Sequence, residues 1–268
     1  MAELFNRARE THLFIPFALL GYPDENSSLD IIRSLIEGGA DMLELGFPFS
    51  DPIADGPVLQ AANSQAIAQG MSVEKCFGLL RRIRSFSALP IGLLLYANIV
   101  YQYGIEKFYA QCKQFSVTTV LVADVPLEES EPFCEAARAS DIGTVFMVCE
   151  LTTPERLEAI IKKTTGFLYV VSKPGVTGAR KELAPSLVLL LKTLRAKTRL
   201  ALFVGFGIST PAHVAGVCEA GADGAICGSA ITQLMNAHSD DKLTMLRELR
   251  KFSLSMKEAT RIGARENI

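Results

Sequence analysis

A single acidic residue lies within an apolar segment near the start of the chain. Glu44 sits in the run MLELGF, where every neighbour favours burial. A buried carboxyl group resists ionisation, so its pKa rises and it can both donate and accept a proton near neutral pH. The sequence therefore predicts a general acid/base at Glu44. The alternative is a core glutamate whose carboxyl group is satisfied by a backbone or tyrosine partner.

A second acid, Asp55, follows in the proline-rich loop SDPIADGP. Asp-Gly is ordinarily a turn dipeptide, so Asp55 alone is a weak indicator of function. Together with Glu44, however, it suggests two carboxylates at one site. One is fixed on a strand, and the other is held by a loop that prolines stiffen. Such a pair is suited to proton transfer.

Glycines mark the ends of two late apolar runs. GFGIST contains Gly205 and Gly207, GSA contains Gly228 and Ser229, and each opens a helical segment. Ser209, Thr210 and Pro211 are expected to form the cap and first turn of the first helix, and Ser229 is expected to cap the second. Bare backbone N–H groups at a helix N-terminus bind anions, so the sequence predicts a phosphate site at Gly207 and Gly228. The alternative is that these glycines only allow tight turns.

Eight short apolar runs, rich in β-branched residues, must position these groups. They lack the polar and apolar alternation of a sheet with one wet face, so they predict buried parallel strands. Helical periodicity lies between them, for example in 27–40 and 104–115. The predicted strands are 13–20, 42–47, 91–96, 120–123, 144–148, 167–171, 200–206 and 225–227.

Alternating strands and helices in 268 residues predict a single α/β domain over 1–268, a (β/α)8 TIM barrel with an extra N-terminal helix. The polar tail after about residue 258 is expected to fray. A doubly wound open sheet is the alternative, but GYPDENSS follows the first strand where that fold carries a glycine-rich fingerprint. In a barrel the site lies at the C-terminal ends of the strands. This rule selects Glu44, Asp51, Asp55, Tyr96, Asn98, Asp124 and Tyr169.

Composition excludes several classes of protein. The chain is 49% hydrophobic with a formal net charge of -2, which indicates neither a nucleic-acid partner nor an anionic membrane surface. No segment resembles a signal peptide or a membrane span, so a cytoplasmic location is expected. The six cysteines and three histidines lie apart in the sequence. They predict no metal site, and the cysteines are interpreted as small buried hydrophobes.

Several motifs together resemble one family over nearly the whole chain. LELGFPFSDPIADGP, LYANIVYQYGIEKFY, VLVADVPLEES, GVTG, GFGIS and GSAI are similar to segments of the tryptophan synthase α chain. The resemblance implies a carbon–carbon lyase of tryptophan biosynthesis, which splits indole-3-glycerol phosphate into indole and glyceraldehyde 3-phosphate. It also implies no cofactor in this chain. The expected partner is a β chain that holds pyridoxal phosphate, in an allosteric αββα heterotetramer.

The resemblance also implies roles for individual residues. Glu44 would move protons between the glycerol hydroxyl and indole C3, while Asp55 would accept the indole N–H. The matching phosphate positions are Thr177, Gly178, Gly207, Gly228 and Ser229. The matching indole-pocket positions are Phe17, Leu94, Tyr96, Leu121, Tyr169 and Phe206. The segments that meet the β chain include Asp51, Asn98 and Pro126.

The chain departs from the family pattern at a few positions. Pro174 lies in the predicted lid SKPGVTGARKE, where relatives commonly have Ser or Thr, and proline removes an N–H donor. Cys149 and Glu150 lie near a usual proline, Leu19 replaces a hydroxyl residue, and Phe47 is bulkier than usual. These departures motivate a second hypothesis, a catalytically weak α subunit that acts mainly as an activator of the β chain. A third, another phosphate-binding barrel such as an isomerase, is disfavoured by the specific PFSDPIADGP loop.

Overall fold

The computed structural model describes residues 2–172 and 184–261, and its strands form one parallel sheet. The strand order is β5-β4-β3-β2-β1-β9-β8-β7-β6. The two edge strands, β5 and β6, are joined directly through Val145, so the sheet closes into a barrel. The strands are β1 Leu13–Leu19, β2 Leu43–Gly46, β3 Ile91–Leu95, β4 Val117–Val122, β5 Gly143–Thr144, β6 Phe146–Val148, β7 Phe167–Val171, β8 Ala201–Gly205 and β9 Gly224–Cys227.

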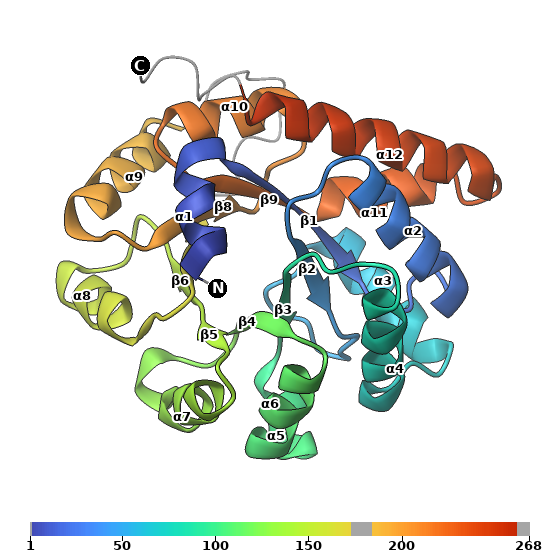
Figure 1. The fold of residues 1–268 in the computed structure, drawn as a ribbon, viewed down its shortest axis with the longest axis horizontal. Helices are drawn as coiled ribbons and strands as arrows, with labels where there is room; N and C mark the ends of the chain where they lie inside the picture. Colours follow the sequence, from blue (N-terminus) through green and yellow to red (C-terminus); the bar gives the residue numbers. More distant parts are fainter. Residues whose placement is uncertain (1, 173–183, 262–268) are drawn as a thin grey trace.

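Helices surround the strands, which confirms the predicted TIM barrel (Figure 1). The early helices are α1 Ala2–Thr11, α2 Glu25–Glu37, α3 Pro57–Ala68, α4 Val73–Arg84, α5 Ala97–Tyr103 and α6 Ile105–Gln114. The later ones are the short 3-10 helix η1 Leu127–Glu129, then α7 Glu131–Ala139, α8 Pro154–Lys163, α9 Pro185–Lys197, α10 Pro211–Glu219, α11 Ser229–Ala237 and α12 Lys242–Ala259. In the ranges that the structure describes, no helix is long and apolar enough to cross a membrane.

Two predicted strands were wrong in extent. The fourth begins at Val117 instead of residue 120, because Thr118 and Thr119 are β-branched and suit a strand although they carry hydroxyls. The predicted fifth strand, 144–148, is two short strands. β5 pairs with β4 and β6 pairs with β7, so the chain changes partner at Val145. The apolar run itself contains no sign of that change.

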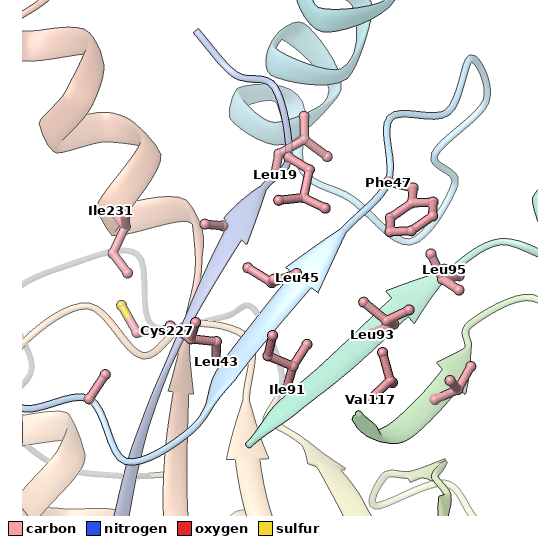
Figure 2. Close-up of a cluster of buried hydrophobic side chains, with 14 of the residues drawn as sticks. Leu19, Leu43, Leu45, Phe47, Ile91, Leu93, Leu95, Val117, Cys227 and Ile231 are labelled. Atoms are coloured by element: carbon pink, nitrogen blue, oxygen red, sulfur yellow. The ribbon is translucent and has the colours of Figure 1, made fainter. Parts of the chain in front are cut away.

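Side chains alternate between two buried faces along each strand. On β2, Leu43 and Leu45 point outward to the helices, as Figure 2 shows for the cluster that also contains Ile91. Met42 belongs to the separate cluster inside the barrel. Because the side-chain period of a strand is two, Glu44 also points inward. Both faces are covered, which explains why the run is almost continuously apolar.

The expected N-terminal helix closes one end of the barrel. Phe5 of α1 contacts the rings of Phe167 and Phe203, each with centroids 6.1 Å apart, near the starts of β7 and β8. Ala8 is fully buried in the same inner cluster. Figure 1 shows α1 across the middle of the ring of strands. Aromatic side chains fill this end, so a substrate is expected to enter from the C-terminal ends of the strands.

The two helices predicted from periodicity are present as α2 and α6. Asp24 caps α2 by accepting hydrogen bonds from Asn26 N and Ser27 N, so this helix begins before the predicted start. It ends at Gly38, and Gly39 takes a positive φ of 95°, as expected of a glycine stop. At the other end of the chain, α12 continues to Ala259. Most of the tail that was expected to fray lies outside the described residues.

An ion pair fastens α12 to the N-terminal end of the barrel. Lys257 Nζ lies 2.7 Å from Asp41 Oδ2, and both side chains are 14% exposed. Asp41 Oδ2 also accepts a hydrogen bond from Phe14 N at 2.9 Å, while Lys257 donates to His12 O at 3.2 Å. Arg7 lies 3.8 Å from the other oxygen of Asp41. This carboxylate is therefore fully provided with partners.

Candidate active site

A cavity of about 730 Å³ opens at the C-terminal ends of the strands. Its floor comes from inward side chains of four strands, namely Phe17, Leu94, Tyr169 and Ile226. The two acids singled out in the sequence, Glu44 and Asp55, both line it. A mostly apolar cavity with a few convergent polar groups is typical of a small-molecule site.

Glu44 lies inside this cavity on β2, opposite Phe17 of β1 and Gly92 of β3. The residue is 3% exposed, and its Oε2 is buried without a hydrogen-bond partner. Burial, and secondarily the charge of Asp55, raises the pKa of Glu44 to about 8. This orphaned oxygen does not fit the alternative of a satisfied core glutamate. The structure instead holds a carboxyl group that is neutral at pH 7 and faces a cavity.

Asp55 comes from the loop between β2 and α3, and its environment differs from that of Glu44. Asn63 Nδ2 donates to Asp55 Oδ2 at 3.3 Å, and the Tyr96 hydroxyl also hydrogen-bonds the carboxyl group. Burial raises the pKa of Asp55, although the bonds from Tyr96 and Asn63 oppose this by stabilising the charged form. Asp55 is therefore a positioned hydrogen-bond acceptor at the rim of the cavity.

Asn63 on α3 positions this loop, and the sequence reasoning missed it. Its side chain is 2% exposed, and its Oδ1 accepts a hydrogen bond from Phe49 N at 2.9 Å, near the start of the loop. Its Nδ2 bonds both Asp55, near the end of the loop, and Leu59 O at 2.8 Å. The segment AANSQAI gives no signal of this role, because an asparagine on a helix is usually a solvated polar residue.

Two predicted pocket residues do not reach the cavity. Tyr96 stacks on Phe49, with ring centroids 5.1 Å apart, and its hydroxyl accepts a hydrogen bond from Ala54 N at 3.2 Å. Tyr96 thus holds the loop that carries Asp55. Leu121 is 3% exposed and packs within the inner cluster of the barrel. Phe17, Leu94, Tyr169 and Phe206 do line the cavity.

The predicted phosphate residues lie together at one end of the cavity. Gly228 and Ser229 line it at the N-terminus of α11, and Gly207 lines it in the turn between β8 and α10. Of the three residues expected to form the cap and first turn of α10, Thr210 is the N-cap and Pro211 is the first helical residue. Ser229 was expected to be a cap, but Gly228 holds that position and Ser229 is the first residue of α11. The turn before α10 and the N-terminus of α11 thus both contribute backbone to the lining of this cavity, as an anion site requires.

Glycine is required at two neighbouring positions for different reasons. A Cβ on Gly205 would lie 2.0 Å from the hydroxyl oxygen of Tyr169, so this glycine makes room for packing. Gly207 has a φ of +77°, a conformation that side chains disfavour. Between them Phe206 takes a φ of +62°, and Ser172 donates hydrogen bonds to the carbonyls of Gly205 and Phe206. Such local strain is typical of functional turns.

The residues expected at a partner interface lie away from the cavity. Asp51, Asn98 and Pro126 are exposed, on the loops and helix start that follow β2, β3 and β4. Asp124, also selected from the sequence, accepts a hydrogen bond from Ala97 N at 2.7 Å and so stabilises the start of α5. Its role in the structure is helix capping.

Three predictions fall outside the described residues. Thr177 and Gly178, expected to bind phosphate, and Pro174, expected in a lid, all lie in 173–183. Of the predicted phosphate residues, the structure therefore describes only those that follow β8 and β9.

The other departures from the family pattern divide into two groups. Leu19 and Phe47 are buried in the outer cluster, where Phe47 contacts the ring of Phe77 at 5.4 Å, so they alter packing and not the cavity wall. Cys149 and Glu150 line the cavity after β6. Cys149 is half-buried, unlike the other five cysteines, which are buried as expected.

Comparison with known proteins identifies a family for this geometry. A sequence profile described as tryptophan synthase alpha chain matches residues 4–261. The tryptophan synthase alpha chain of Methanothermobacter thermautotrophicus is 44% identical over 96% of this chain and 95% of its own length. That of Klebsiella pneumoniae subsp. pneumoniae is 46% identical over 97% and 96%.

Solved structures are similar as well. A chain of the tryptophan synthase α2β2 complex from Pyrococcus furiosus, described in terms of mutual activation, superposes with a TM-score of 0.85 and 36% identity. The match covers 91% of this chain and 97% of that one. The alpha subunit of Legionella pneumophila superposes with a TM-score of 0.87 and 28% identity, over 97% of both chains.

Proposed function

Because the chain belongs to the tryptophan synthase alpha chain family, we propose that the cavity lined by Glu44 and Asp55 performs the lyase reaction of that family. The reaction cleaves indole-3-glycerol phosphate to indole and glyceraldehyde 3-phosphate in tryptophan biosynthesis. One observation carries the assignment. A carboxyl group with a pKa of about 8 and an unpartnered oxygen faces an apolar cavity beside a second, positioned carboxylate.

In the first step Glu44, neutral below about pH 8, donates its proton to C3 of the indole ring. Protonation of carbon places positive charge on the ring nitrogen. Asp55 accepts the N–H hydrogen bond and stabilises this charge. The dry strand interior keeps the acid protonated, which carbon protonation requires.

In the second step the Glu44 carboxylate takes the proton of the glycerol hydroxyl next to the scissile bond. The oxygen becomes the carbonyl of glyceraldehyde 3-phosphate, and the carbon–carbon bond breaks. Its electron pair returns to the ring and neutralises the nitrogen, which releases indole. Glu44 ends protonated as it began, so the cycle needs neither a redox cofactor nor a net proton.

The rest of the cavity fits the two ends of this substrate. Phe17, Leu94, Tyr169 and Phe206 offer apolar walls to the indole ring, with Tyr96 and Leu121 supporting the site from outside the cavity. Gly207, Gly228 and Ser229 offer backbone N–H groups to the phosphate. Thr177 and Gly178 are proposed as further phosphate contacts from the sequence alone.

The partner in this family is the tryptophan synthase β chain, as in the α2β2 complex of Pyrococcus furiosus. Pyridoxal phosphate belongs to that subunit, and the α chemistry described above uses none. We place the interface at the exposed Asp51, Asn98 and Pro126. Ile53 and Tyr101, on the same loops and helix, are 77% and 68% exposed, as expected of apolar groups that a partner covers. A cytoplasmic location stays a prediction, supported by the biosynthetic role of the family.

Indole release from indole-3-glycerol phosphate, measured with and without the β chain, tests the assignment. We expect release by the α chain alone and a higher rate in the complex. Absence of release in both conditions would favour the alternative, an α subunit that only activates the β chain. The geometry disfavours that alternative, because both carboxylates are present and aimed at the cavity.

A further inference from the structure

We propose that His213 is a phosphate-binding residue that supplies positive charge to the substrate at the glycine end of the cavity. This inference rests on the proposed function, since it takes the corner at Gly207 and Gly228 to be the phosphate site. His213 lines the same cavity from the first turn of α10. Neither the motifs of the sequence nor the mechanism above uses this residue.

The ring of His213 is held against the turn that carries Gly207. Its Nδ1 accepts a hydrogen bond from Ser209 N at 3.3 Å and lies 3.4 Å from Ser209 Oγ. A ring that accepts through Nδ1 carries its proton on Nε2 when it is neutral. Among the residues that the structure describes, Nε2 has no hydrogen-bond partner. The donor nitrogen is therefore available to a ligand.

The charges around the cavity make this nitrogen significant. Of the described residues that line the cavity, Glu44, Asp55 and Glu150 are acidic, while none is lysine or arginine. The remaining titratable groups there are Cys149, Tyr169 and His213, and of these only His213 becomes positively charged on protonation. Neither α12 nor β9, both packed against α10, contributes a charged side chain to the lining. His213 is thus the one described side chain that can offset a phosphate charge within the cavity.

Backbone donors alone already bind anions. The histidine adds to the affinity for the phosphate, and its contribution depends on pH because only the protonated ring is charged. An imidazolium donates a charge-assisted hydrogen bond, which is stronger than a bond from a neutral ring. Protonation also converts Nδ1 to a donor, which can then bond Ser209 Oγ in place of Ser209 N. The amide of Ser209 is released at the same time. Affinity for a phosphate ester should therefore rise as the ring becomes protonated.

Nuclear magnetic resonance can follow this residue directly, because the chain has only three histidines. Sulfate is the probe, since it remains a dianion over the range in which histidine titrates. Bound sulfate should shift the amide signals of Gly207 and Gly228 and move the titration midpoint of the His213 ring to higher pH. The rings of His12 and His238 should not respond. Assignment of the ring signals comes from His213→Gln and His238→Gln.

The glycine amide signals test the phosphate site, and the titration of the His213 ring tests the role of His213. If the glycine amides shift while the His213 titration does not, the phosphate site stands and the proposal for His213 is overturned. If the glycine amides do not shift either, the phosphate site itself is wrong. A sulfate response of the His213 ring alone, without the glycines, would also contradict the shared site.

Kinetics provide the second readout. His213→Ala should raise KM for indole-3-glycerol phosphate by about two- to five-fold, the range expected for a partly exposed charge interaction. The value of kcat should change less than two-fold. His213→Gln keeps a neutral donor, so its affinity should lie between those of the wild type and His213→Ala. His238→Gln, at the far end of α11, is the control. A KM of His213→Ala equal to that of the wild type would refute the proposal.

Discussion

Asp41 and Glu44 lie on the same segment of chain, but their carboxyl groups have opposite environments. Asp41 precedes β2 at the closed end of the barrel, where Lys257, Arg7 and the amide of Phe14 provide its oxygens with partners. Glu44 lies three residues later at the open end, where one oxygen has none. The same chemical group is thus fully paired just before β2 and has an unpaired oxygen within β2.

The difference shows how a barrel separates stability from chemistry. A largely buried ion pair is tolerated only where both groups have further partners, and Asp41 has them where it fastens α12 to the barrel. A buried carboxyl group without partners keeps its proton instead, and Glu44 becomes an acid of usable strength. The rest of the fold offsets the free-energy cost of burying Glu44, so that stabilising contacts lie at the N-terminal face of the barrel and the candidate site at the C-terminal face.

The largest expected effect is the dependence of stability on pH. The folded state holds the Glu44 proton up to about pH 8, whereas an unfolded glutamate releases it near its ordinary value of 4.5. The unfolding free energy of the wild type should therefore fall, relative to Glu44→Gln, as pH rises from 4.5 to 8. The total difference should be on the order of 4 kcal/mol. Denaturant titrations of both proteins measure it, and parallel curves across this range would contradict an unpaired Glu44.

Removal of the acid should nearly abolish the reaction. Glu44→Gln keeps the size of the side chain but cannot exchange a proton. Indole release should fall by at least ~10²-fold, within the range assigned to general acid–base catalysis. Binding of the β chain should be unchanged, which serves as the control for folding. Turnover within a few-fold of the wild type would exclude Glu44 as the acid.

Replacement of Asp41, the paired acid, should lower stability and leave indole release unchanged. Asp41→Asn leaves the largely buried Lys257 ammonium without a charged partner. The unfolding free energy should therefore fall by about 2 kcal/mol. Indole release well below the melting temperature should stay within two-fold of the wild type. Asp30→Asn is a matched control, because Asp30 also bonds α12, through Lys242 at 2.8 Å, but both side chains are over 40% exposed. That exposed pair should contribute less than about 1 kcal/mol.

Replacement of Asn63, which positions the loop acid Asp55, should have the smallest effect. Asn63→Ala removes a donor to Asp55 and the anchor of Phe49 N, so kcat should fall roughly ten-fold, as for a misaligned catalytic group. Asn63→Asp should be worse, because a second carboxylate opposes the charge of Asp55. Ser64→Ala, on the same helix, is the control, since Ser64 bonds only Gln60 O. Equal kcat values for Asn63→Ala and Ser64→Ala would remove the positioning role.

Much of this arrangement could be predicted from the sequence, because strong local patterns produced it. Continuous apolar runs predicted the parallel strands, and Glu44 stood out against its own run. Glycine at the ends of β8 and β9 indicated the part of the cavity at which the phosphate site is proposed. The specific loop that contains Asp55 made the family recognisable.

The remainder depends on contacts between distant segments, which no local pattern encodes. Asn63 acts only because the loop folds back over α3. Tyr96 looks like a pocket residue in sequence, yet its ring turns toward Phe49. Val145, where the fifth strand changes partner, is one apolar residue among several. His213 is an isolated histidine until the turn after β8 brings it to the cavity.

The protonation state of Glu44 is the central claim, and infrared spectroscopy measures it most directly. The difference spectrum between the wild type and Glu44→Gln isolates the carbonyl stretch of one protonated carboxyl group. The structure predicts that this band is present at pH 7 and disappears with a midpoint near pH 8. A band that is already absent at pH 7, with a midpoint near the ordinary 4.5 of glutamate, would contradict the account.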